Sequence, residues 1–230
     1  MIKNSILLGV AVVGMWFLAG CSAKNPTGPN GANTVTDIDG NAYRTVTIGT
    51  QVWMAENLKT TRYNDGTVIP LVTDLTAWSN LTTPGYCWYN DSAIYGNTYG
   101  ALYNWFAVNR GKLAPPGWHV PTDSEWTVLS TYLGGDSVAG GKLKEAGTTH
   151  WLSPNTGATN ATGFTALPGG IRSYDGTFYG IGGDGYWWSA TAYAYDARNS
   201  WQRTMYYATT NVYHGYEDTH QGFSVRCVRD

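Results

Sequence analysis

Histidine and acidic side chains, which carry most acid–base and metal chemistry, are sparse in this 230-residue chain, in which 13% of residues are charged. The densest group is His-x2-Glu-Asp-x-His at residues 214–220, whose nitrogen and oxygen donors could hold a divalent metal. This segment reads as a loop without a rigid frame, so we predict no metal there. Other loop acids, such as Asp184 and Asp196, have no spacing that pins two carboxylates together as a glycosidase requires. We therefore expect no enzymatic activity and no cofactor.

Aromatic side chains are abundant, with 11 Trp and 17 Tyr. Trp and Tyr combine a flat apolar face with a polar edge, which suits stacking on sugar rings or filling a protein interface. Two segments that we predict to be long loops, 192–199 and 208–221, carry or adjoin the candidate ligand-binding residues Tyr193, Tyr195, Trp201, Tyr207, Tyr213 and Tyr216. We expect a glycan or an envelope protein to bind there, and not at the N-terminal strands, whose short turns leave little room. That these rings merely pack the loops onto the body is the open alternative.

Cys21 has the most specific sequence context of the three cysteines. Lys3 precedes an apolar run over residues 6–18, which is too short for a bilayer span and typical of a secretory signal. The run ends in Leu18-Ala19-Gly20-Cys21, which resembles the bacterial lipobox, whose cysteine becomes the lipidated first residue of the mature protein. We predict that Cys21 carries lipid and attaches the protein to a membrane. An ordinary signal peptide with a chance cysteine is the alternative.

The chain then divides into three parts: a signal peptide over 1–20, a tether over 21–33 and a folded domain over 34–230. The tether is rich in Pro, Gly and Asn, which is typical of a flexible linker. Ser22, and not Asp, follows Cys21, and by resemblance to sorted lipoproteins this favours the outer membrane. The side of that membrane stays open.

Cys87 and Cys227 both lie in apolar, strand-like settings of an exported chain, where the compartment can be oxidising. We predict a disulfide between them that ties the last strand to the body. Two buried free thiols are the alternative. A catalytic thiol lacks an adjacent His, Lys or acidic partner, with Arg226 the only charged neighbour.

The formal net charge of −2 excludes one class of partner. Nucleic-acid binding depends on clustered Lys and Arg that neutralise phosphates, and the sequence contains no basic block. We therefore expect no nucleic-acid partner.

Short strands are predicted at both ends of the domain, with helices between them. At the N-terminal end, runs 35–38, 43–48 and 51–54 are separated by glycine turns and predict a three-stranded meander. In the C-terminal half, strands are predicted over 164–167, 170–173, 178–179, 186–191, 201–207 and 223–228.

The clearest helix start is Thr122, followed three residues later by Glu125, a spacing that predicts a capping box. Gly134 ends this helix. A weaker helix is predicted over 138–145, and a single helical turn near 75–78.

Seven segments in order resemble the Fibrobacter succinogenes major paralogous domain, a family of exported bacterial proteins. They are residues 37–43, 46–59, 99–105, 117–126, 163–170, 187–191 and 222–229. The resemblance covers about residues 35–230 and implies no established activity. The later segments also resemble the C-type-lectin-like fold shared with formylglycine-generating enzymes, so we expect an α+β fold of this type with two helices in the middle of the chain.

Two activities known in that fold are not expected. The formylglycine-generating enzymes use a pair of late cysteines, and the late half of this chain holds only Cys227. The calcium-dependent sugar site needs an acid-Pro-Asn or Gln-Pro-Asp loop, and the C-terminal half has neither. A structural envelope lipoprotein without a specific ligand is the alternative to a recognition module.

Overall fold

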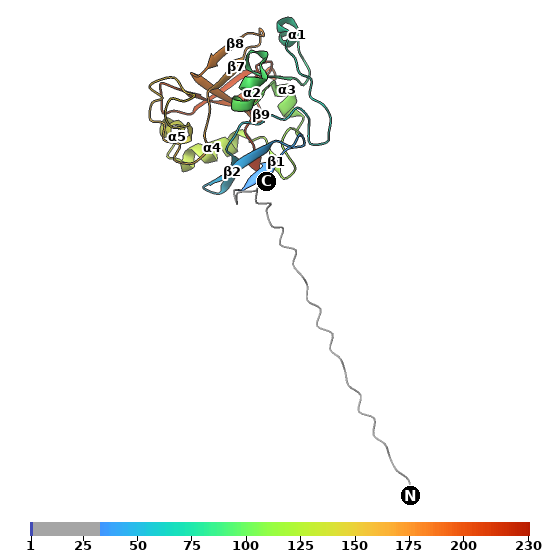
Figure 1. The fold of residues 1–230 in the computed structure, drawn as a ribbon, viewed down its shortest axis with the longest axis vertical. Coiled ribbons are helices and arrows are strands. Elements are labelled where there is room, and N and C mark those ends of the chain that lie inside the picture. Colours follow the sequence, from blue (N-terminus) through green and yellow to red (C-terminus); the bar gives the residue numbers. More distant parts are fainter. Residues whose placement is uncertain (2–32) are drawn as a thin grey trace.

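The computed structural model describes Met1 and residues 33–230, and the latter form the predicted α+β arrangement, with two five-stranded sheets and one two-stranded sheet (Figure 1). The strands are β1 (Thr34–Thr36), β2 (Ala42–Ile48), β3 (Gln51–Met54), β4 (Tyr86–Cys87), β5 (Leu102–Tyr103), β6 (Trp118–His119), β7 (Gly169–Arg172), β8 (Phe178–Ile181), β9 (Asp184–Ala192), β10 (Asn199–Tyr206), β11 (Tyr213–Asp218) and β12 (Val228–Arg229). The helices are α1 (Leu75–Ser79), α2 (Ala93–Tyr99), α3 (Trp105–Asn109), α4 (Asp123–Tyr132) and α5 (Asp136–Leu143), with a 3-10 turn η1 (Tyr89–Asp91).

The predicted N-terminal meander is confirmed and forms one side of the first sheet, whose order is β1-β2-β3-β12-β6. Asp37 shapes the β1–β2 turn because its carboxylate accepts hydrogen bonds from the backbone N–H groups of Asp39 and Asn41, each at 2.9 Å. β12 pairs antiparallel with both β3 and β6, so the last strand lies beside the N-terminal meander. In Figure 1, β1 and β2 lie at one end of the domain and β8 at the other.

The second sheet, in the order β11-β10-β9-β7-β8, corrects one loop prediction. The segment 208–221 contains β11, which pairs antiparallel with β10 over the whole of its length. Its residues, Tyr-His-Gly-Tyr-Glu-Asp, do not alternate between apolar and polar, so periodicity cannot identify the strand. The other predicted loop shrinks to residues 193–198, which connect β9 to β10.

Two predicted C-terminal strands are also corrected. Residues 164–167 form no strand and make a single bridge, between Ala166 and Lys144. The predicted strand over 223–228 is reduced to β12, because the residues before it bridge in turn to different neighbours. Those bridges are Arg172–Gly222, Tyr103–Phe223 and Trp187–Ser224.

The predicted capping box at the start of α4 is confirmed. The Thr122 hydroxyl accepts a hydrogen bond from the Glu125 backbone N–H at 3.3 Å, and the Glu125 carboxylate accepts one from the Thr122 N–H at 2.8 Å. α5 begins slightly earlier than predicted, and α1 forms where a single turn was expected. Helices α2 and α3 were not predicted, because each is too short to display an amphipathic repeat.

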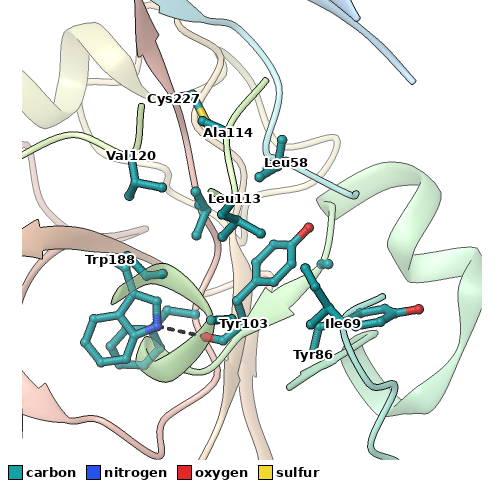
Figure 2. Close-up of a cluster of buried hydrophobic side chains, with 14 of the residues drawn as sticks. Leu58, Ile69, Tyr86, Tyr103, Leu113, Ala114, Val120, Trp188 and Cys227 are labelled. Atoms are coloured by element: carbon teal, nitrogen blue, oxygen red, sulfur yellow. Dashed lines mark hydrogen bonds between the residues drawn. The ribbon is translucent and has the colours of Figure 1, made fainter. Parts of the chain in front are cut away.

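The hydrophobic core joins residues that are distant in the sequence. Its largest cluster packs Leu58, Tyr103 and Trp188 against residues from most parts of the domain (Figure 2). The Trp188 indole N–H donates to the Tyr103 carbonyl at 2.8 Å, and the Tyr103 hydroxyl donates to the Thr60 carbonyl at 2.7 Å. The polar atoms of these large buried side chains are therefore satisfied within the core.

A buried cation links the family-like segments. Arg226 is fully buried, and its guanidinium donates to Asn57 Oδ1 at 2.8 and 3.2 Å and to the Met54 carbonyl at 3.1 Å. The Trp187 indole N–H donates to the same Asn57 oxygen at 2.9 Å. Burial lowers the pKa of Arg226 to about 9, so this side chain stays charged at neutral pH. These residues of the family-like segments therefore have an architectural role.

The predicted Cys87–Cys227 disulfide is wrong, because both cysteines are free thiols. Each is fully buried, but they belong to different apolar clusters: Cys87 lies with Trp78, and Cys227 with Tyr103 (Figure 2). Burial raises the pKa of Cys87 to about 12 and that of Cys227 still further above its usual range. The apolar settings that suggested a bridge reflect two separately buried thiols.

Within the residues that the structure describes, no helix combines the length and the apolar character needed to cross a bilayer. The predicted signal peptide, the tether and Cys21 lie outside the described residues, apart from Met1 and Asn33.

Candidate functional site

Four of the predicted aromatic residues meet in space, and we call Tyr193, Tyr195, Trp201 and Tyr216 the aromatic cluster. Tyr193 lies at its centre. Its ring stacks on Tyr216 with centroids 4.0 Å apart and an interplanar angle of 17°, and it meets Trp201 edge-on at 5.0 Å. Tyr195 contacts Tyr193 at 5.5 Å. The four rings form one contiguous aromatic surface.

Strand register positions this cluster. Trp201 on β10 lies directly opposite Tyr216 on β11, and opposite residues of an antiparallel pair share a face of the sheet. Tyr193 follows β9, and its backbone N–H donates to the Asn199 carbonyl at 3.1 Å, which closes the β9–β10 hairpin. Tyr195 lies in the turn of that hairpin. Hairpin closure and β10–β11 pairing together bring these rings into contact.

The cluster has a half-buried base and an exposed rim. Tyr195 is 87% exposed and Tyr216 is 49% exposed, whereas Tyr193 and Trp201 are half-buried. The stacked base holds its rings in fixed orientations, because each ring is packed against at least two others. The rim leaves aromatic surface in contact with solvent, where a ligand could pack on it.

His214 extends the cluster. Its ring packs on Trp201 with centroids 4.4 Å apart, and its Nε2 lies 2.9 Å from an Asp123 carboxylate oxygen. The same carboxylate accepts a hydrogen bond from the buried Arg203 at 2.7 Å. Sequence reasoning assigned His214 only to a metal segment. The useful signal was its spacing of two residues from Tyr216, which places both on one face once β11 is known to be a strand.

Polar groups of the hairpin turn lie next to Tyr195 in the chain. The Asp196 carboxylate accepts hydrogen bonds from the Arg198 backbone N–H at 3.0 Å, from the Arg198 guanidinium at 3.1 Å and from the Asn199 amide at 3.2 Å. These bonds, chiefly those from Arg198, hold the pKa of Asp196 below its usual range. An ionised acid, an exposed guanidinium and an amide thus accompany the exposed ring.

The His-x2-Glu-Asp-x-His segment does not converge on a metal site. His214 and Glu217 lie three residues apart on β11, so their side chains extend from opposite faces. His220 is turned toward its neighbour, with Nδ1 2.6 Å from Asp218 Oδ1, and its ring packs edge-on against Phe106. Among residues 33–230, no three His, Cys, Asp or Glu side chains are placed so that they could hold a metal ion.

The structure does not bring Tyr207 and Tyr213 to the cluster. Tyr213 lies opposite Thr204 on the other face of the sheet, where its ring contacts Tyr206 with centroids 5.1 Å apart. Tyr207 follows β10 and packs against a core cluster. The strand period of two separates Tyr213 from Tyr216, three residues later on β11, whereas Tyr207 lies beyond the end of β10.

The family model of the Fibrobacter succinogenes major domain matches residues 46–229, which is most of the chain and includes the aromatic cluster. The comparison with curated proteins and the comparison with solved structures give no match. The matched range begins after the first strand of the meander and ends in the last strand, β12. The chain therefore belongs to the Fibrobacter succinogenes major domain family.

Proposed function

We propose that the domain is a non-catalytic recognition module that binds a glycan through the aromatic cluster. The observation that carries the proposal is the contact between four aromatic rings whose outermost member, Tyr195, is 87% exposed. If Tyr195 served only to pack the hairpin, its exposed ring would gain little stabilisation, because most of its apolar surface stays in water.

The ligand class follows from the chemistry around the rings. The C–H face of a sugar ring packs on an aromatic face, while its hydroxyls need donors and acceptors nearby. Asp196, Arg198 and Asn199 supply both kinds of group beside Tyr195. Each favourable ring contact is worth roughly 0.5–1.5 kcal/mol beyond the buried area, so a few contacts give weak binding to one chain segment. Many anchored copies on one surface would then bind a polymer by avidity.

The location is part of the proposal. We infer that lipid on Cys21 attaches the module to the outer membrane, with the segment 21–33 as a tether. Support comes from the sequence alone: the apolar run and the Leu-Ala-Gly-Cys motif. Several acyl chains on one residue anchor stably, because each buried CH2 contributes about 0.8 kcal/mol. Cys21→Ser should leave the protein in the aqueous phase of a detergent partition, whereas continued partition with the membrane fraction would contradict the anchor.

A structural envelope lipoprotein is the second candidate, and one observation favours it. Asn57 and Arg226, both from family-like segments, hold the core together and face no ligand surface. On this alternative the aromatic cluster packs the hairpin and binds nothing.

We also propose that the α+β arrangement is of the C-type-lectin-like type. Helices α4 and α5 in the middle of the chain support it, as does the pairing of the last strand, β12, beside the N-terminal meander. An experimental structure with a different strand order in the first sheet would contradict this assignment.

Tyr195→Ala tests the binding proposal against the structural alternative. We expect the variant protein, purified as the full chain in detergent, to melt like the parent and to lose about fivefold or more in retention on the polysaccharide that the parent binds best in a glycan array. Tyr179→Ala is the matched control, because Tyr179 is 53% exposed and lies outside the cluster. If neither the parent nor its variants bind any glycan, or if Tyr195→Ala binds as the parent does, the proposal is wrong.

A further inference from the structure

A cavity of about 360 Å³ lies at the N-terminal meander, on the side of the domain where we expected no binding site. Three stretches of chain form it: the β1–β2 turn with Asp39 and Asn41, the segment after β3 with Lys59, and α2 with Asn97, together with the indole of Trp88. The hollow arises because α2 and Trp88 pack beside the turn.

The walls of this cavity are held in place by bonds within the domain. Asp39 accepts hydrogen bonds from the Thr61 hydroxyl at 3.0 Å and from the Arg62 guanidinium at 2.6 Å. Asn41 donates its amide N–H to Asp37 at 2.9 Å, which leaves its carbonyl oxygen as an acceptor. The β1–β2 turn is therefore fixed to the segment that carries Lys59.

The apolar wall is equally constrained. A Cβ atom added at Gly96 of α2 would overlap the Trp88 ring, so the indole lies directly against the helix backbone. Tyr86 meets the same ring edge-on, with centroids 5.3 Å apart. Trp88 is thus held between a helix and a core tyrosine, and its orientation does not depend on a ligand.

The charged groups that line the cavity are one ammonium and one carboxylate. Among residues 33–230, the Lys59 ammonium makes no ion pair, and the Asn97 side chain makes no hydrogen bond. Asp39 is an acid in the same wall. Although burial raises its pKa, hydrogen bonds from Thr61 and Arg62 bring that pKa below its usual value, so the carboxylate is ionised at neutral pH. The Arg62 guanidinium, 2.6 Å away, already pairs with this carboxylate, so the lining holds no surplus negative charge and the Lys59 ammonium can donate to a ligand hydroxyl.

We propose that this cavity binds one neutral pyranose ring, with Trp88 against its apolar face and Lys59, Asn41 and Asn97 hydrogen-bonded to its hydroxyls. An indole among amide, ammonium and carboxylate groups is the combination that a polyhydroxylated ring with an apolar face requires. The volume lies at the small end of the usual range of ligand pockets, which is about 300–1,000 Å³, and this favours a single ring over a longer chain. The proposal uses no residue of the aromatic cluster and does not depend on glycan binding there.

Ligand-observed NMR on the full chain in detergent micelles tests the proposal. The probes are the methyl glycosides of glucose, galactose, mannose and N-acetylglucosamine, with glucuronic acid as a charged comparison. We expect at least one neutral glycoside to show saturation transfer and to be displaced by excess of the same sugar. If no neutral glycoside binds, or if only glucuronic acid does, the proposal is overturned.

Variants locate the binding. Asn97→Ala and Lys59→Met should each weaken the neutral glycoside about fivefold or more, while Thr98→Ala, an exposed neighbour on α2 that does not line the cavity, should bind as the parent does. Tyr179→Ala, at an exposed residue outside both the cavity and the aromatic cluster, should leave glycoside binding unchanged. If instead Tyr195→Ala abolishes it and Asn97→Ala does not, the sugar binds at the aromatic cluster and the cavity proposal fails while the proposed function stands.

Discussion

Replacing Asn57 by alanine should destabilise the domain more than almost any other single substitution of a polar residue. The side chain is 6% exposed, and its carbonyl oxygen accepts hydrogen bonds from Arg226 and from the Trp187 indole. Its amide N–H donates to the Tyr99 carbonyl at 2.8 Å. One truncation therefore removes one acceptor of a buried cation, the acceptor of an indole and a donor to a backbone carbonyl.

The magnitude follows from these contacts. A hydrogen bond to a charged group is worth about 1.5–3 kcal/mol, and an unsatisfied buried polar group costs about 1–3 kcal/mol. Arg226 keeps the Met54 and Thr165 carbonyls as acceptors, but it loses the Asn57 oxygen, and the Trp187 indole loses its acceptor, so we expect a loss of about 3–5 kcal/mol in the free energy of unfolding. For a domain of this size, that corresponds to a fall in Tm of roughly 2–4 °C for each kcal/mol.

Urea unfolding followed by tryptophan fluorescence measures the loss, provided that the slope against urea stays unchanged. Asn97→Ala is the control, since it truncates an exposed asparagine and should change stability by less than about 0.5 kcal/mol. The double variant Asn57→Leu with Arg226→Met should lose less than the sum of its single variants, because no buried charge remains. A loss below about 1 kcal/mol for Asn57→Ala would refute the reasoning.

Two further predictions concern the thiols and a histidine. Cys87 and Cys227 should react with a thiol reagent only after denaturation, and a reductant should leave the Tm unchanged. Rapid reaction of either thiol in the native protein, or a Tm lowered by reductant, would contradict free buried thiols. His119 lies between the carboxylates of Asp230 at 2.6 Å and Glu125 at 2.8 Å. Burial lowers its pKa, but these two hydrogen bonds more than offset this, so its pKa is raised above 6.5. The stabilisation by the imidazolium is therefore complete below the unfolded pKa and is lost as pH rises through the folded pKa. Because the ring is 37% exposed, solvent screening limits the effect to about 1 kcal/mol or less. The Tm of the parent should fall relative to that of His119→Gln as the pH rises above about 6.5, and parallel profiles would count against this role.

The elements that the sequence predicts correctly are those whose causes are local. The meander depends on short runs and glycine turns, and the start of α4 depends on Thr122 and Glu125, three residues apart. Each signal lies within a few residues, so one window of sequence contains the whole physical cause.

The features that the sequence predicts wrongly have causes that are distant in the sequence. Cys87 and Cys227 look alike in the sequence, but a disulfide requires a short separation between the two residues, and only the packing of the two apolar clusters determines that separation. β11 was not predicted, because its stability comes from hydrogen bonds to β10 and not from an apolar repeat in its own residues.

The two candidate sites also differ in how far the sequence predicts them. Composition alone indicated an aromatic surface near residues 193–216, because Tyr and Trp are concentrated there. Strand register then decided which rings meet: Tyr216 faces Trp201, whereas Tyr213 lies on the other face of the sheet. The cavity beside Trp88 has no signal in the sequence, since its walls come from three separate segments, 39–41, 59–61 and 88–97. Local side-chain chemistry determines turns, caps and residue types, but the convergence of distant segments is decided by tertiary packing, because it depends on the shape of the whole core.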